Sequence, residues 1–132
     1  MRLWLAAMLA FAVAACLSSG QRVSHEYAVG DSQNGLTVKV HTGDTVRVTL
    51  DSTAWTISGS SDAAVLEQDG QQLVSPAPAG TCFPGEGCGT TSALYRAVKL
   101  GKAIVDASRV SCGEARVCVG AEGKYEVTVV VV

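Results

Sequence analysis

The sequence has little of what catalysis and metal binding usually require. It contains only two histidines, His25 and His41, and neither lies at a spacing typical of metal ligands. His41 falls on the polar side of a predicted strand, beside a turn, so we expect a solvated surface side chain. No GxSxG, HExxH or Ser-His-Asp arrangement is present, and nothing suggests paired catalytic carboxylates. We therefore expect a protein that is not an enzyme and that uses neither a metal nor a cofactor.

Concentrated charge is missing as well. Ten lysines and arginines stand against twelve aspartates and glutamates, without a run of either sign. A basic patch, which is the usual signature of nucleic-acid binding, is absent from the sequence. The glycines of the GEGCG segment do not lie between a strand and a helix, so we expect no phosphate-binding loop there. The composition therefore argues against nucleic acid as a partner.

Helical periodicity is absent after the first fifteen residues, and strict alternation takes its place. Val46, Val48 and Leu50 alternate with polar residues, and the same pattern returns from Tyr125 onward. Period two with β-branched side chains predicts half-buried antiparallel strands. The expected strands are 36–40, 46–50, 54–58, 63–67, 71–74, 90–98, 102–109 and 124–132, with 27–29 as a further edge strand. Seven or eight short strands separated by frequent turns predict an all-β, immunoglobulin-like antiparallel β-sandwich over residues 35–132.

Turn residues divide these strands. Thr42-Gly43-Asp44 predicts a turn between two neighbouring strands, and Asp69-Gly70 is the strongest hairpin signal in the chain. Leu100-Gly101 joins the next two strands. Residues 75–80 contain two prolines and cannot form a central strand.

The N-terminus reads as an export signal. Arg2 precedes an apolar run over residues 3–13, which is well short of the roughly 20 residues that span a bilayer. The run ends in V-A-A-C at residues 13–16, which resembles the lipobox of bacterial lipoproteins. The resemblance implies a signal peptide over residues 1–15, lipidation at Cys16 and an outward-facing location on the cell membrane. Residues 16–34 then form a lipid-anchored tether that includes the possible edge strand.

The cysteines support this interpretation. There are five, and an unpaired cysteine in an exported protein requires an explanation that lipidation of Cys16 would supply. The other four form two CX5C pairs, a spacing that is neither a zinc knuckle nor a redox CXXC motif. Among the three possible pairings we favour the local ones, Cys82–Cys88 and Cys112–Cys118. Each would close a small loop and contribute about 2 kcal/mol in the chain-entropy model.

Two resemblances concern the domain itself. Residues 97–105 (AVKLGKAIV) resemble a strand pair of bacterial immunoglobulin-like domains. More widely, residues 36–132 are similar to chagasin-like cysteine-protease inhibitors. In the second strand, the similarity rests on Gly43, Asp44, Val46, Val48 and Leu50. Trp55 corresponds to the end of the family's first recognition loop, Gly87-Cys88-Gly89 to its second recognition loop, and Arg109 to the start of its third recognition loop. The resemblance implies a small immunoglobulin-like domain that inhibits papain-type proteases.

The recognition loops depart from that family. Its Asn-Pro-Thr-Thr-Gly loop would fall near residues 51–55, which read DSTAW and contain neither proline nor glycine. Val110 and Ser111 follow Arg109, where the family has proline and an aromatic residue. The strand framework therefore matches better than the loops.

Strand order places the two cysteine loops at one end of the sandwich, because alternate loops cluster there. The loop before Trp55 should join them, while Trp55 itself is expected in the core. Either the loops are tied only to resist proteolysis, or they form a preorganised binding surface. The candidate surface residues are Phe83, Gly87, Gly89, Arg109, Glu114 and Arg116. For Phe83 itself, packing over the end of the core is slightly favoured over a binding contact.

These observations favour an extracytoplasmic, lipid-anchored binding domain. The expected partner is a protein, with a protease as the leading candidate. The alternative is an adhesion or accessory module that binds a component of the cell envelope without inhibitory activity.

Overall fold

The computed structural model describes residues 20–83 and 85–132. The expected signal peptide over residues 1–15 and the lipidation site Cys16 lie outside the described residues. Within the described ranges, no helix has the length and apolar character needed to cross a membrane.

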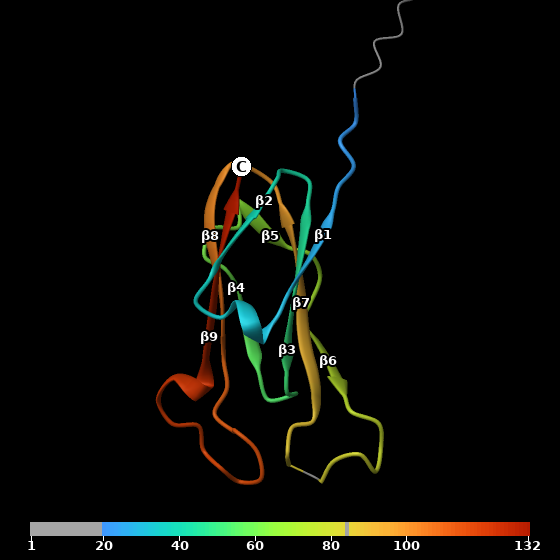
Figure 1. Cartoon of the computed structure of the whole chain (residues 1–132), viewed down its shortest axis with the longest axis vertical. Coiled ribbons are helices and arrows are strands. Elements are labelled where there is room, and N and C mark those ends of the chain that lie inside the picture. Colours follow the sequence, from blue (N-terminus) through green and yellow to red (C-terminus); the bar gives the residue numbers. More distant parts are fainter. Residues whose placement is uncertain (1–19, 84) are drawn as a thin grey trace, which may run out of the picture.

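The described chain forms two β-sheets that pack face to face (Figure 1). Its strands are β1 (Glu26–Val29), β2 (Thr37–Val40), β3 (Thr45–Asp51), β4 (Thr56–Ser60), β5 (Leu66–Gln68), β6 (Leu73–Pro76), β7 (Gly89–Ala97), β8 (Gly101–Ser108) and β9 (Lys124–Val131). Two short 3-10 helices, η1 (Asp31–Gln33) and η2 (Gly120–Gly123), precede β2 and β9. The first sheet has the order β1-β3-β7-β5, with β6 also on β7, and the second has the order β2-β9-β8-β4. The predicted all-β sandwich is confirmed.

Alternation explains the core. In β3 the apolar residues Val46, Val48 and Leu50 are fully buried, whereas the residues between them are partly exposed. β8 and β9 bury every second side chain in the same way. The buried apolar side chains of both sheets form one cluster, which includes Trp55 and Tyr95. The Tyr95 hydroxyl donates to the carbonyl of Ser58 at 2.8 Å, so its polar group is satisfied inside the sandwich.

Two edge pairings are parallel rather than antiparallel. β1 runs parallel to β3, and β2 runs parallel to β9. The turn at residues 42–44 therefore does not join two paired strands, because β2 belongs to the second sheet and β3 to the first. Turn residues specify that the chain reverses, but both strands can bury their apolar faces across the sandwich instead of pairing side by side.

The predicted hairpin at Asp69-Gly70 is wrong. β5 and β6 do not pair with each other; both pair with β7, along consecutive stretches of the same edge. Gly70 has φ +81°, which lets the chain bend away from β7 and return to it. Gln72 lies in this bend and connects the two sheets, because its Oε1 accepts a hydrogen bond at 2.6 Å from the N–H of Ile57 in β4.

A buried carboxylate fixes the point where the chain enters the sandwich. Asp44 is only 1% exposed, and its two oxygens accept the backbone N–H groups of His25 at 3.0 Å and His41 at 2.8 Å. These two hydrogen bonds hold the pKa of Asp44 below its usual value, and the guanidinium of Arg22 at 3.7 Å lowers it further. The imidazole of His41, expected at the surface, is 47% exposed and lies 3.7 Å from the carboxylate. Asp44 thus ties the start of β1 to the turn between β2 and β3.

Replacing Asp44 with asparagine is expected to lower the free energy of unfolding at neutral pH. It should also make that free energy fall less steeply as the pH is lowered. Because the folded state lowers the pKa of Asp44, its contribution is complete above the unfolded value near 3.8 and is lost as the pH falls through the folded value. Urea unfolding at a series of pH values measures this. The pKa values of Glu26 and Glu122 are also lowered, so a residual decline is expected. An Asp44→Asn protein with the same acid dependence as the parent would contradict this role, and Glu114→Gln is the control.

Candidate binding surface at the disulfide-tied end

Three loops meet at one end of the sandwich (Figure 1). We call them the middle loop (residues 52–55, between β3 and β4), the first disulfide loop (residues 77–88, between β6 and β7) and the second disulfide loop (residues 109–123, between β8 and β9). β7 and β8, expected as neighbouring strands, belong to different sheets. The chain nevertheless reverses between them across the sandwich, so both disulfide loops lie at the same end, as predicted.

The structure confirms both predicted disulfides. Cys82 pairs with Cys88 at a Cα–Cα distance of 6.1 Å, and Cys112 pairs with Cys118 at 5.0 Å. Glu86 lies inside the first bridge, where its Oε2 is 2.9 Å from the Cys82 sulfur and accepts the N–H of Phe83 at 3.2 Å. Cys82, Cys88 and Glu86 are close enough together to suggest a metal cluster, but the disulfide occupies both sulfurs. The bridges therefore act as loop constraints.

The middle loop is hydrogen-bonded to the first disulfide loop and to β7. Ser52 donates its N–H to the carbonyl of Gly89 at 2.8 Å, and Thr53 donates to Gly87 at the same distance. The carbonyl of Ser52 accepts the buried hydroxyl of Thr91 at 2.9 Å. Ser52 has φ +114°, a conformation that residues other than glycine rarely adopt and that persists only where the surroundings fix it. Its hydrogen bonds provide that constraint.

Gly87 is required by this close approach. Its φ is +70°, and a Cβ built on it would lie 2.9 Å from the Oγ of Ser52. A side chain here would be strained by the positive φ and would force the Ser52 hydroxyl, which accepts the N–H of Ala54, to move. Gly87 thus lies at a contact between two loops, whereas Gly89 is the first residue of β7.

Trp55 links the middle loop to the second disulfide loop. It is buried in the core, as expected, and its indole Nε1 donates to the carbonyl of Asp51 at 3.0 Å. The guanidinium of Arg109 lies over the indole ring, 4.4 Å from its centroid, and Arg109 Nε donates to the carbonyl of Glu122 at 3.1 Å. Tyr125 meets the indole edge-on. Arg109 therefore lies partly buried beneath the surface loops.

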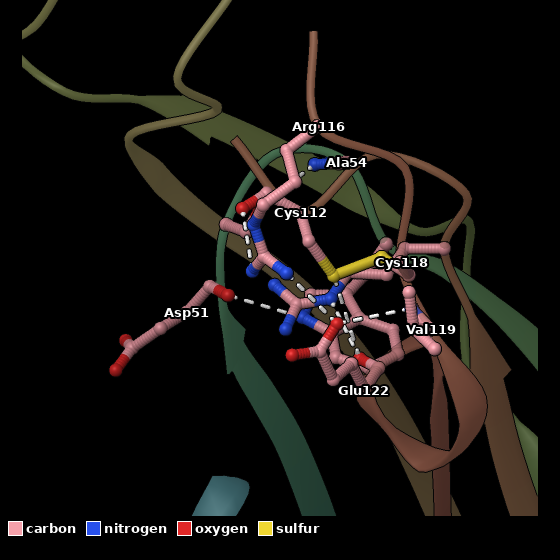
Figure 2. The surroundings of a disulfide bond; sticks show 10 residues. Asp51, Ala54, Cys112, Arg116, Cys118, Val119 and Glu122 are labelled. Atoms are coloured by element: carbon pink, nitrogen blue, oxygen red, sulfur yellow. Dashed lines mark hydrogen bonds and ion pairs between the residues drawn. A yellow bond between two sulfur atoms is a disulfide. The ribbon is translucent and has the colours of Figure 1, made fainter. Parts of the chain in front are cut away.

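The second disulfide loop is held by an internal ion pair. Figure 2 shows Arg116 directed at Glu122: its Nη1 lies 2.9 Å from the Glu122 carboxylate and its Nη2 donates to the carbonyl of Cys112 at 3.2 Å. The same carboxylate accepts the N–H of Val119, which is the main cause of the lowered Glu122 pKa, with Arg116 second. Glu114, at the exposed tip, has a positive φ of 25°. Arg116 is therefore a structural partner as well as a surface residue.

A shallow hollow of about 520 Å³ opens between the two disulfide loops. It is lined by Glu86, Cys88, Cys112, Gly113, Glu114 and Arg116. Phe83 lines a separate hollow within the first disulfide loop, and 74% of its surface is exposed, so it does not pack over the core. The candidate residues Phe83, Gly87, Glu114 and Arg116 thus belong to one end of the molecule, and their roles in binding stay predictions.

Sequence reasoning missed the valines of the second disulfide loop. Val110, Val117 and Val119 are each more than 60% exposed. Apolar residues beside both cysteines of a tied loop were the available signal, because a short loop has no core in which to bury them.

No known protein family matches the sequence, and no curated protein is similar to it in sequence. Solved structures are similar in fold. The cysteine protease inhibitor EhICP2 from Entamoeba histolytica superposes with a TM-score of 0.58 at 8% identity, covering 85% of this chain and all of that one. Amebosin superposes with a TM-score of 0.57 at 11% identity, covering 83% of this chain and all of that one. The likeness concerns the fold, and it agrees with the strand framework identified in the sequence.

Proposed function

We propose that this protein binds a cysteine protease through its disulfide-tied end. The observation that carries the proposal is the joining of three loops into one fixed surface, on a fold similar to that of a cysteine protease inhibitor. Disulfides, the middle-loop hydrogen bonds and the Trp55–Arg109 stack hold the loops before any partner arrives. Such preorganisation favours affinity, because less conformational freedom is lost on binding.

The surface has the composition of a protein-binding site. Phe83 offers an exposed aromatic side chain, and aromatic anchors often dominate binding energy. Val110, Val117 and Val119 extend the apolar area on the second disulfide loop. Glu86, Glu114 and Arg116 supply polar groups around the hollow. Exposed apolar side chains beside polar groups are typical of protein interfaces.

Inhibition of a papain-type protease tests the proposal. The protein is expected to inhibit at or below micromolar concentration, and Phe83→Ala should raise the inhibition constant at least about tenfold if Phe83 is an anchor. Leu100→Ala, an exposed apolar residue at the opposite end, is the matched control and should leave the constant unchanged.

Absence of inhibition at micromolar concentration would refute the protease as partner. Recovery of a cell-wall polymer or membrane protein in a pull-down, lost on replacing Phe83 and Arg116, would then support the adhesion or accessory role instead.

We further propose that lipidation at Cys16 anchors the protein to the outer face of the cell membrane. The described chain leaves the sandwich at the end opposite the disulfide loops (Figure 1), so an anchor before residue 20 would direct the loops away from the membrane. Cys16→Ala is expected to release the protein into the medium or leave its precursor uncleaved. Unchanged membrane retention, measured by cell fractionation, would refute the anchor.

A further inference from the structure

The end of the sandwich opposite the disulfide loops carries an apolar turn. We call it the tether end: the chain before β1, the turn at residues 42–44, the turn at residues 98–100, and the first residues of β8. Leu100 is 65% exposed, and Val98 and Val23 are exposed as well. The turn is held in place, since the N–H groups of Val98 and Lys99 both donate to the carbonyl of Val65. These side chains are therefore presented outward by a fixed backbone.

Three lysines lie in or near this turn. Lys99 lies between Val98 and Leu100, and Lys39 and Lys102 both lie opposite Val130 on the outer face of the second sheet. In residues 20–83 and 85–132, none of these three lysines is within ion-pair distance of a carboxylate. Their charges are therefore free to attract an anionic surface.

The carboxylates nearest to the tether end are already hydrogen-bonded. Asp44 is buried and accepts two backbone N–H groups, with Arg22 beside it. Asp62, in the turn before β5, accepts the N–H of Ala64 at 3.0 Å. Arg22, Lys39, Lys99 and Lys102 therefore stand against Asp44 and Asp62 near this end, which gives an excess of positive charge on a chain that is slightly acidic as a whole.

We propose that the tether end docks on an anionic phospholipid surface. Leu100 and Val98 enter the interfacial region, and Lys39, Lys99 and Lys102 face the headgroups. The place where the described chain begins selects this occupant, because residues 20–25 leave the sandwich at this same end (Figure 1). The inference takes its orientation from the anchor proposed at Cys16 and is independent of the protease. Apolar contact and lysine charge together favour such docking, and salt weakens the electrostatic part.

Vesicle co-sedimentation of residues 20–132 tests this docking without the anchor. This segment contains both sheets, every residue of the described core and both disulfides, so we expect it to fold as one unit. We expect binding to vesicles of phosphatidylcholine with about one third phosphatidylglycerol, weaker binding to phosphatidylcholine alone, and a bound fraction that falls with added salt.

Variants at the two ends decide the result. Lys99→Glu is expected to lower the partition coefficient about tenfold, and Leu100→Ser should lower it several-fold. Arg116→Glu and Phe83→Ser make matched changes at the disulfide-tied end and should leave vesicle binding unchanged. Circular dichroism confirms that each variant is folded. No binding to anionic vesicles, or equal losses at the two ends, would overturn the proposal, whereas failure of the anchor itself would appear only with Cys16→Ala.

Discussion

Trp55→Ala is expected to lower the free energy of unfolding by about 3–5 kcal/mol, which is the usual cost of removing a large buried aromatic side chain. The indole is 5% exposed and packs between Arg109 and the edge of Tyr125. Its loss leaves a cavity and also removes the hydrogen bond to the carbonyl of Asp51. The middle loop and the second disulfide loop would then lose their shared support, so we expect weaker partner binding as well. Denaturation in urea, followed by circular dichroism, measures the stability change.

Trp55→Phe is the matched control for this prediction. It keeps an apolar ring in the core but removes the indole N–H, and we expect a loss of about 1–2 kcal/mol. A loss below about 1 kcal/mol for Trp55→Ala would contradict its position in the core.

Gly89→Ala is expected to destabilise the protein by about 3 kcal/mol or more, since it combines backbone strain with a steric clash. Gly89 has φ +124°, a conformation that residues with a Cβ rarely adopt. A Cβ there would overlap the carbonyl oxygen of Ser75 and would lie 2.8 Å from the backbone nitrogen of Ala77. The clash is with backbone on the neighbouring strand β6, so no side-chain rotation relieves it. Thermal unfolding should show the loss directly.

Gly80→Ala separates the clash from the backbone conformation. Gly80 also has a positive φ, +82°, but a Cβ there would meet no atom within 4 Å. We expect a cost of about 1–2 kcal/mol, which is the ordinary penalty for a left-handed residue with a Cβ. Equal losses for the two variants would show that close packing of β6 against β7 contributes nothing.

Much of the fold could be predicted from local patterns. Alternation located the strands, with boundaries that differ by a few residues from those observed, because side chains on a strand face opposite sides in turn. Local cysteine pairing was also predictable, since a separation of six residues brings two cysteines together through a short loop. Trp55 was expected in the core because immunoglobulin-like sandwiches commonly bury a tryptophan on the third strand, and it is buried.

The candidate surface was predictable in location but not in construction. Glycine and cysteine spacing indicated the loops that carry Gly87 and Phe83. It did not indicate that Ser52 adopts a positive φ, nor that Arg109 stacks on Trp55. Both features depend on atoms contributed by segments far apart in the sequence.

The sequence by itself determined the strand positions, the two small disulfide loops and the clustering of those loops at one end. These follow from period-two alternation, short loop closure and chain reversal, which act over a few neighbouring residues. Only the tertiary structure decided that β2 and β3 lie in different sheets, that β1 and β2 pair in parallel, and that β5 and β6 share the edge of β7. An apolar strand face can be buried equally well by several arrangements of neighbours, so the packing of the whole core selects among them.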